Sequence, residues 1–230
     1  IYFVFLQKIG RQMVKRAIVI GAGGLVGNEL IKVLLASAGS EEVVVLVRKE
    51  LPIKHHKLTQ LLIDFNRLDD YSDAIKGDAV FCCLGSTRKK TPDLNEYRKI
   101  DHDYPLQLAL IALGNNVNQY HLVSAIGADA GSSNFYNKMK GETEQDIIKA
   151  GLPALHIYRP SLLTGKRKES RPMEVFFAAL MKVVDPLLFG SPKKYRSIAA
   201  VTVAKAMYNQ SIKNEVGVHI YPSDKIKELA

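Results

Sequence analysis

The sequence contains no tryptophan and only two cysteines in 230 residues. Cys82 and Cys83 are adjacent and lie within the apolar run 79–84, so we interpret them as free thiols in a buried strand. A disulfide framework or a cysteine-based metal site needs spaced cysteines, and the chain has none. The cysteine pattern therefore predicts no metal site and a reducing, cytoplasmic setting.

Long hydrophobic runs are also missing, since a membrane-spanning helix needs about 20 predominantly apolar residues in succession. Residues 1–6 are apolar, but Lys8 and Arg11 follow them, whereas a secretory signal carries its charges before the apolar stretch. We expect residues 1–12 to be a non-native or disordered leader, with Met13 as the natural start. The sequence thus predicts no membrane partner.

Negative charge is in deficit, with 23 Asp and Glu against 32 Lys and Arg, which gives a net charge of +9. The cations are scattered in short clusters such as 88–90, without a repeating basic stripe or interleaved aromatic residues. This pattern argues against a nucleic-acid surface and favours an anionic cofactor or substrate. Hydrophobic residues make up 47% of the chain and charged residues 24%, a balance typical of a globular domain.

Apolar runs and helical periodicities alternate along the chain. Short apolar runs predict strands at 16–20, 43–47, 61–63, 78–84, 119–123, 155–158 and 218–221. Helical spacing predicts helices at 25–36, 68–75, 94–113, 136–150, 173–184 and 201–210. This alternation predicts an α/β fold: a Rossmann-like doubly wound parallel sheet with a small C-terminal substrate lobe. We expect residues 13–230 to form one domain, with 160–230 contributing the lobe and 165–172 a hinge or substrate loop.

A glycine-rich turn joins the first predicted strand to the first predicted helix. Gly21, Gly24 and Gly27 are three positions apart. The first permits a tight turn, the second lets a pyrophosphate approach the backbone, and the third allows close packing of helix on strand. The N-terminus of the helix presents free N–H groups to the phosphates. The turn therefore predicts a bound dinucleotide.

The end of the second predicted strand indicates which dinucleotide. NAD sites usually place Asp or Glu there to bind the ribose hydroxyls, whereas this chain has Arg48 and Lys49. Two cations at this position suit a 2′-phosphate, so we expect the cofactor to be NADP(H).

Two further strand ends fit the same site, because ligands of open parallel sheets bind at the carboxyl ends of the strands. The third predicted strand is followed by Asp64 and Phe65, a polar and aromatic pair that we expect near the adenine. The fourth leads into a small turn that we expect near the ribose and nicotinamide: Leu84, Gly85, Ser86 and Thr87.

Three residues downstream form a candidate catalytic set. Ser124 follows the fifth predicted strand, and Tyr136 and Lys140 lie four positions apart, hence on one helix face. A phenol has an ordinary pKa near 10, and a neighbouring cation lowers it. Such a pair can move a proton to or from a carbonyl oxygen while a nicotinamide carries the hydride, with the serine orienting the carbonyl. His121 lies inside a strand, and we expect it to be packed rather than to act as a base.

Taken together, these residues resemble the short-chain dehydrogenase/reductase superfamily in its atypical branch, from Arg16 to the C-terminus. Within this branch they resemble in particular the family of the human Tat-interacting-protein oxidoreductase and its bacterial relatives. The segments that carry this resemblance are 19–27, 83–87, 132–142 and 159–172, the last including the run Glu169-Ser170-Arg171-Pro172.

The resemblance implies a single Rossmann-like domain that binds NADPH, with Ser124, Tyr136 and Lys140 as the catalytic set. It further implies the residues that line the cofactor: Gly23, Gly24, Leu25, Val26, Arg48, Lys49, Leu84 to Thr87, Tyr136 and Lys140, with Leu163 and Arg171 near the nicotinamide end. Many members of the superfamily also carry an Asn on the helix before the fifth strand. Here that stretch holds Asp101 and His102, so a four-residue proton relay is not implied.

The leading interpretation is an NADP(H)-dependent oxidoreductase acting on a small carbonyl or alcohol. One alternative is a nucleotide-sugar epimerase or dehydratase, against which Arg48 and the small C-terminal lobe both count. A second is a non-catalytic regulator that senses NADPH, which the sequence leaves open. A cationic nucleic-acid-binding module is the third. The sequence leaves both a monomer and a homodimer open.

Overall fold

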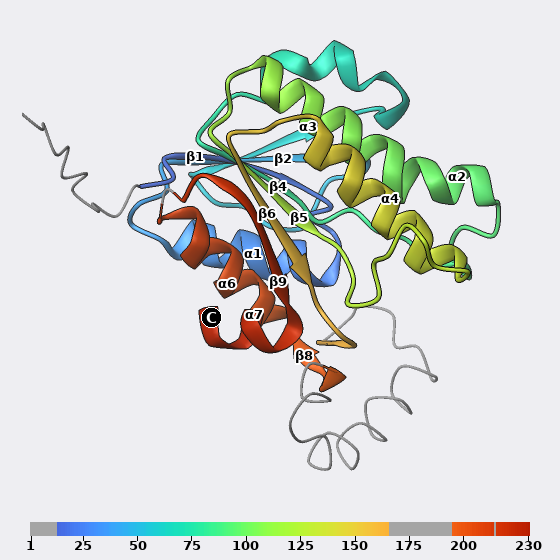
Figure 1. Cartoon of the computed structure of the whole chain (residues 1–230). Coiled ribbons are helices and arrows are strands. Elements are labelled where there is room, and N and C mark those ends of the chain that lie inside the picture. Colours follow the sequence, from blue (N-terminus) through green and yellow to red (C-terminus); the bar gives the residue numbers. More distant parts are fainter. Residues whose placement is uncertain (1–12, 166–194, 214) are drawn as a thin grey trace, which may run out of the picture.

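The computed structural model describes residues 13–165, 195–213 and 215–230 (Figure 1). The predicted leader at 1–12, the helix predicted at 173–184 and most of the loop expected at 165–172 lie outside the described residues.

Seventeen elements follow one another in the described residues, mostly strand and helix in turn. The strands are β1 (Arg16–Ile20), β2 (Glu42–Val47), β3 (Leu58–Leu62), β4 (Ala79–Cys82), β5 (Gln119–Val123), β6 (Ala154–Arg159), β7 (Leu163–Thr164), β8 (Ile198–Ala199) and β9 (Gly217–Pro222). The helices are α1 (Leu25–Ala36), the 3₁₀ segment η1 (Phe65–Ala74), α2 (Leu94–Arg98), the π-helical segment η2 (Lys99–Asp103), α3 (Tyr104–Gly114), α4 (Phe135–Lys149), α6 (Ala200–Ser211) and α7 (Ser223–Leu229).

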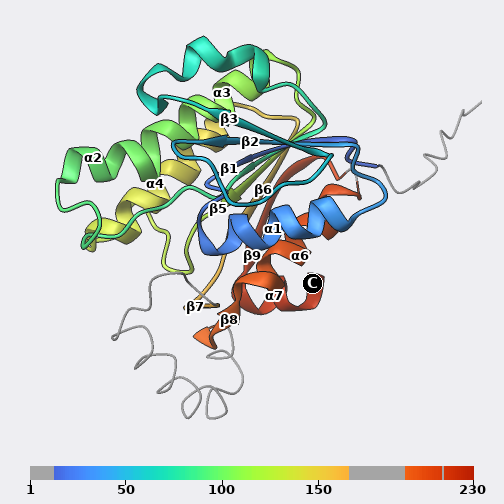
Figure 2. The same cartoon turned by 180° about the vertical axis from the view of Figure 1, so that it is seen from behind.

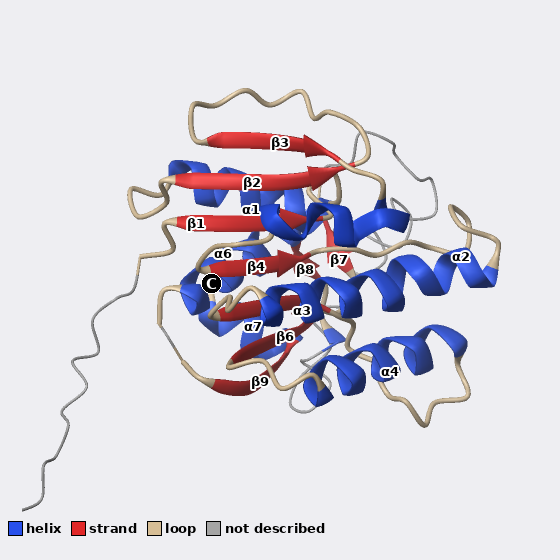
Figure 3. Cartoon of the chain, turned by 90° about the horizontal axis from the view of Figure 1, so that it is seen from above, coloured by secondary structure: helices blue, strands red, loops and turns tan. Residues whose placement is uncertain are grey.

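Seven strands form one sheet in the order β3-β2-β1-β4-β5-β6-β9, and every neighbouring pair is parallel (Figure 3). The chain first runs outward from β1 to β3 and then returns to continue on the other side of β1 with β4. The loops that follow β1 and β4 therefore meet at the point where the strand order reverses. In doubly wound sheets this switch point is where nucleotides bind.

Helices cover both faces of the sheet (Figures 1 and 2). Helices α1, α6 and α7 lie on one face, while η1, α3 and α4 cover the other. Successive residues of a strand point to opposite faces, so β1 contributes Ala17 and Val19 to the first core and Ile18 and Ile20 to the second. Strands β1, β2 and β4 are apolar beyond Arg16 and Glu42, the first residues of β1 and β2, because both faces of these strands are buried.

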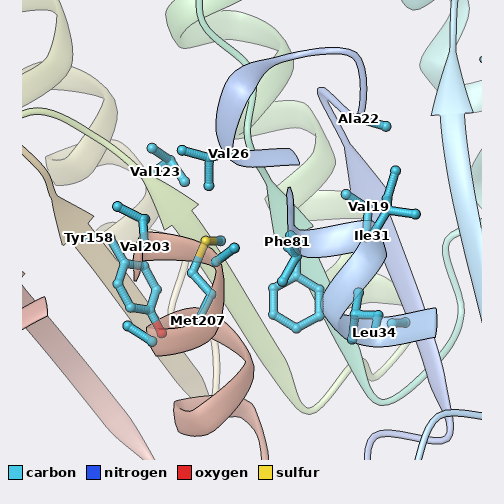
Figure 4. Close-up of a cluster of buried hydrophobic side chains, with 14 of the residues drawn as sticks. Val19, Ala22, Val26, Ile31, Leu34, Phe81, Val123, Tyr158, Val203 and Met207 are labelled. Atoms are coloured by element: carbon cyan, nitrogen blue, oxygen red, sulfur yellow. The ribbon is translucent and has the colours of Figure 1, made fainter. Parts of the chain in front are cut away.

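The core beneath α1 and α6 shows how the two helices share one face (Figure 4). Ile31 and Leu34 of α1 and Val203 and Met207 of α6 pack against the same side of the sheet, where Phe81 lies between them. This dense packing fixes the axis of α1, and with it the position of the N-terminus of that helix.

The predicted fold class is confirmed, and several elements match their predicted bounds, including α1 and β5. The helix predicted at 94–113 is wrong as one continuous α-helix, because the π-helical turn η2 separates α2 from α3. The helix predicted at 68–75 is a 3₁₀ segment that begins earlier, at Phe65, since the Asp64 side chain caps it. The third strand lies at Leu58–Leu62 instead of 61–63, and it is an edge strand with polar residues in its middle.

Most described residues of the predicted lobe belong to the main body. Helix α6 covers the sheet, and β9 pairs with β6 at its edge. Only the short strands β7 and β8 form a separate two-stranded sheet. Neither strand was predicted, because each has two residues and no periodicity to detect.

Candidate functional site

The glycine turn lies against the end of β4. Gly21 has a φ of 79°, and a Cβ placed on it would lie 2.4 Å from the carbonyl carbon of Cys83. A Cβ on Gly27 would lie 2.4 Å from the carbonyl oxygen of Gly21. Both positions therefore require glycine, one for its conformation and its neighbour, the other for the close packing of α1 on the turn. These are the roles that the spacing predicted for them.

The N-terminus of α1 is open to an anion. Gly24 is the N-cap residue, it is exposed, and no side chain caps the helix. The first turn of α1 contains no acidic residue that would compete for the free N–H groups. Gly23 is exposed beside it, whereas Val26 is buried, so Val26 offers its backbone rather than its side chain. A helix end of this kind binds phosphate through its N–H groups and its dipole.

The cations that follow β2 are available to a ligand. Arg48 and Lys49 are both exposed, and within the described residues neither forms a salt bridge. After β3, the Asp64 carboxylate accepts hydrogen bonds from the backbone and side-chain nitrogens of Asn66, while Phe65 is buried against Tyr104. Asp64 and Phe65 thus form contacts within the protein directly after the carboxyl end of β3.

The turn after β4 is held in place from the helix side. The Ser86 backbone N–H donates to Asp101 Oδ2 at 2.7 Å, and the Ser86 and Thr91 hydroxyls lie 2.6 Å apart. The carbonyl oxygen of Thr87 accepts from the backbone N–H groups of Lys90 and Thr91. Gly85 is exposed, and Leu84 is half-buried against the core under α3.

Ser124 lies just past β5, and its backbone N–H donates to the carbonyl oxygen of Tyr158 at 2.7 Å. The residue is 5% exposed, and among the described residues its Oγ has no hydrogen-bond partner. A buried hydroxyl without a partner costs free energy, so a ligand atom that forms a hydrogen bond with Ser124 Oγ would be stabilised there.

Helix α4 carries the other two candidate catalytic residues. Asn134 caps this helix by accepting from the backbone N–H groups of Tyr136 and Asn137. Tyr136, in the first turn, is 37% exposed, whereas Lys140 is 4% exposed. The phenol is therefore accessible to substrate and solvent, and the ammonium is shielded from both.

Two close contacts fix α4 against the loop that carries Ser124. A Cβ on Gly141 would lie 2.1 Å from the backbone nitrogen of Ala130, and one on Gly127 would lie 2.7 Å from the Asn137 side chain. The helix and the loop after β5 consequently form one packed unit. The sequence spacing of Ser124, Tyr136 and Lys140 could not reveal these contacts.

Lys140 forms an ion pair with Asp101 of η2, with 2.9 Å between Nζ and Oδ1. Burial disfavours the ammonium, but Asp101 and then Tyr136 outweigh it and raise the pKa of Lys140 above its ordinary value. Asp101 is 1% exposed and stands where an Asn was expected from the superfamily pattern. Sequence reasoning noted this residue only as a departure, because residues 99–103 are mostly polar and nothing local marks Asp101 as the buried acid among them.

The remaining candidate residues fall at the margin of this site. Leu163 in β7 packs partly against the core under α1, and a Cβ on Gly165 would lie 3.3 Å from the Leu25 side chain. That contact brings Gly165, directly after β7, to the start of α1. Arg171 lies outside the described residues. The prediction that His121 is packed is confirmed, because it is fully buried and lies within hydrogen-bonding distance of Tyr158 and Gln119.

Within the described ranges, no cluster of His, Cys, Asp and Glu side chains has the composition to hold a metal ion. No helix in the same ranges is long and apolar enough to span a bilayer. Cys82 and Cys83 are both free thiols, as predicted.

A family model and two related proteins place the chain in the same family. The model of an NAD(P)H-binding family matches residues 21–209. HTATIP2 of Rattus norvegicus is 32% identical over 209 residues, which cover 86% of this chain and 81% of that protein. The mitochondrial protein FMP52 of Candida albicans is 34% identical over 157 residues, covering 66% of this chain and 69% of the relative.

Solved structures agree on the fold. WbmF of Bordetella bronchiseptica in complex with NAD+ superposes with a TM-score of 0.70 at 15% identity, over 96% of this chain and 78% of that one. MoeE5 in complex with UDP-glucose and NAD gives a TM-score of 0.68 at 18% identity, over 90% and 75%. At these identities the likeness establishes the Rossmann-like architecture alone.

Proposed function

Because this chain belongs to the NAD(P)H-binding family, within the atypical short-chain dehydrogenases/reductases that resemble HTATIP2, we propose that it is an NADP(H)-dependent oxidoreductase acting on a small carbonyl or alcohol. One observation carries this proposal. The buried hydroxyl of Ser124, which has no partner among the described residues, and the open glycine turn both follow the carboxyl ends of parallel strands, β5 and β1. The helix that carries Tyr136 and Lys140 packs against the loop after β5.

Each residue has a defined task in this proposal. Bound NADPH supplies a hydride to the carbonyl carbon of the substrate. The Tyr136 hydroxyl donates a proton to the carbonyl oxygen, and Ser124 Oγ donates a hydrogen bond to the same oxygen. Lys140, held by Asp101, stays protonated on the same helix as the phenol while the proton leaves it. Solvent restores the proton to Tyr136, which is 37% exposed.

The choice of NADP(H) over NAD(H) rests on Arg48 and Lys49. Both are exposed and outside any salt bridge of the described residues, so they can bind a 2′-phosphate without first breaking an ion pair. We expect Arg48→Ala to weaken binding of NADPH at least tenfold, about 1.4 kcal/mol, and to leave binding of NADH nearly unchanged. Arg67→Ala is the control, because Arg67 is exposed and pairs with Asp70 in η1. Equal effects on both cofactors would refute the 2′-phosphate assignment.

Turnover is tested with Tyr136→Phe. The variant should lose carbonyl reduction, followed through the absorbance of NADPH across a panel of aldehydes and ketones, and should keep its affinity for NADPH. Tyr104→Phe removes an α3 hydroxyl that donates to Asn66 Oδ1 in η1, and this variant should retain the activity of the parent protein. If the Tyr136→Phe variant remains active, the phenol is not the proton donor.

The same assays separate the alternative functions. NADPH binding without turnover of any carbonyl would favour a regulator that senses the cofactor. The cytoplasmic location inferred from the cysteines stays a prediction, because the fungal relatives are named as mitochondrial proteins.

A further inference from the structure

The π-helical segment η2 places a buried carboxylate between the two halves of the candidate site. Segment η2 interrupts the helical run between α2 and α3, and Asp101 lies at its centre with 1% of its surface exposed. π-helical turns are rare and often occur at functional sites. A buried carboxylate is costly in free energy unless cations or hydrogen-bond donors surround it.

The two carboxylate oxygens of Asp101 reach different parts of the site. Oδ1 lies 2.9 Å from Lys140 Nζ, on the helix that carries Tyr136. Oδ2 accepts from the backbone N–H of Ser86 at 2.7 Å, in the turn after β4. The carbonyl oxygen of Asp101 also accepts from the Thr143 hydroxyl at 3.1 Å, which ties η2 to α4. One side chain thus joins the proposed cofactor turn to the candidate catalytic lysine.

The charge of Asp101 alters what Lys140 does to nearby phenols. A free ammonium next to a phenol stabilises the phenolate, so it favours a deprotonated tyrosine in the resting protein. A carboxylate 2.9 Å from the same ammonium opposes that effect, since the pair together carries no net charge. The pKa of Tyr97, which is buried beside this cluster, shows how the effects of Asp101 and Lys140 compare at a nearby phenol. Burial, followed by Asp101 and Tyr136, raises its pKa in spite of Lys140 and Arg88.

On the premise of the proposed function, we propose that Asp101 is a positioning residue that compensates the charge of Lys140 and fixes it against the Ser86 turn. Tyr136 then lies beside a compensated ion pair instead of a free cation, so the phenol keeps its proton in the resting protein. This protonated phenol is the form that reduction of a carbonyl uses. The hydride forms the new C–H bond, the electron pair of the C=O π bond takes the Tyr136 proton, and Lys140 keeps its own proton.

The test is a spectrophotometric titration of tyrosinate in the protein without cofactor. Asp101→Asn keeps the shape of the side chain and removes its charge. The contribution of Tyr136 is obtained by subtracting the titration of the matching variant that also carries Tyr136→Phe. We expect the tyrosinate signal of Tyr136 to begin about one pH unit lower in Asp101→Asn than in the parent protein. Asp103→Asn is the matched control, because Asp103 is in the same segment, is about half exposed and contacts His102 instead of Lys140.

An unchanged onset in Asp101→Asn would overturn the proposal. Should that variant fail to fold, the double variant Asp101→Asn with Lys140→Met removes both charges of the buried pair. Its Tyr136 signal should begin close to that of the parent protein, and an onset at much higher pH would show that Lys140 acts on Tyr136 without compensation. The titration needs no cofactor, so it remains informative if NADPH does not bind. Failure to bind NADPH would instead refute the proposed function.

Discussion

Three histidines form a continuous stack through one face of the sheet, which makes acid stability the property most directly predictable from this structure. Phe81, His121, His156 and His219 are register partners on β4, β5, β6 and β9. Their successive ring centroids are 4.6, 4.6 and 5.0 Å apart. His121 and His156 are completely buried. Stacked neutral imidazoles pack well, but a proton added to one of them is poorly solvated.

The size of the effect of acid on stability follows from the pKa of His156. Burial, followed by the charge that His219 would carry and opposed by a backbone hydrogen bond at Glu215, lowers the pKa of His156 from 6.5 to about 4. Lys213 acts in the same direction as His219, and Tyr221 contributes a hydroxyl 3.0 Å from Nδ1. Burial also lowers the pKa of the adjacent His121, with His156 as the second cause.

The sign follows from which state binds the proton. Below pH 6.5 the unfolded chain takes up a proton at this histidine while the folded protein does not, so stability falls as the pH decreases toward 4. Each pH unit in this window costs about 1.4 kcal/mol, which amounts to about 2 kcal/mol at pH 5 from His156 alone. For a chain of this size, that corresponds to a decrease in Tm of about 4–8 °C.

The measurement is Tm against pH for the parent protein, His156→Gln and His56→Gln. His156→Gln keeps a polar group toward Tyr221 but cannot titrate, so its Tm should fall less steeply below pH 6.5. His56 is exposed, and its substitution should leave the slope of the parent protein unchanged. Identical slopes for His156→Gln and the parent protein would refute the argument from burial.

Two substitutions test the packing that holds the site. Gly27→Ala places a Cβ 2.4 Å from the carbonyl oxygen of the first glycine of the turn, so urea unfolding should show a loss of about 1–3 kcal/mol, with weaker NADPH binding. Gly114→Ala meets nothing within 4 Å and should show neither effect. Glu144→Gln breaks the two-pronged contact between buried Glu144 and Arg159, which joins α4 to β6, and should cost about 2 kcal/mol by the same assay. Glu142→Gln, at the more exposed pair with Arg98, should cost less than about 1 kcal/mol.

The sequence predicted the sheet well because its strands are buried on both faces. A run such as Arg16–Ile20 is apolar at nearly every position, as a strand covered on both faces requires. The edge strand β3 was misplaced for the complementary reason. It is partly exposed, so Thr59 and Gln60 interrupt the apolar run that would mark its start. Strand order was not readable from any local pattern, because it depends on where each crossover connection returns.

The candidate site was predictable only in part. Gly21, Gly27, Tyr136 and Lys140 follow spacings that have a physical reason within a few residues of chain. Asp101 does not, since its role comes from contacts with Ser86 and Lys140, which belong to other elements. The helical periodicity also continues through η2, which hides the turn that brings this carboxylate inward.

The cations of this site divide into two kinds by their surroundings. Arg48 is exposed and outside any salt bridge of the described residues, so it loses little by binding an anionic ligand, and added salt screens it. Lys140 is buried and paired, so its charge is already compensated and screened little by salt. Exchanging these environments would harm both proposed tasks, because a paired Arg48 would have to break an ion pair before it could bind the 2′-phosphate. A solvated Lys140 would in turn lose its fixed position beside Tyr136. The net charge of +9 therefore says less about function than the burial of each individual cation.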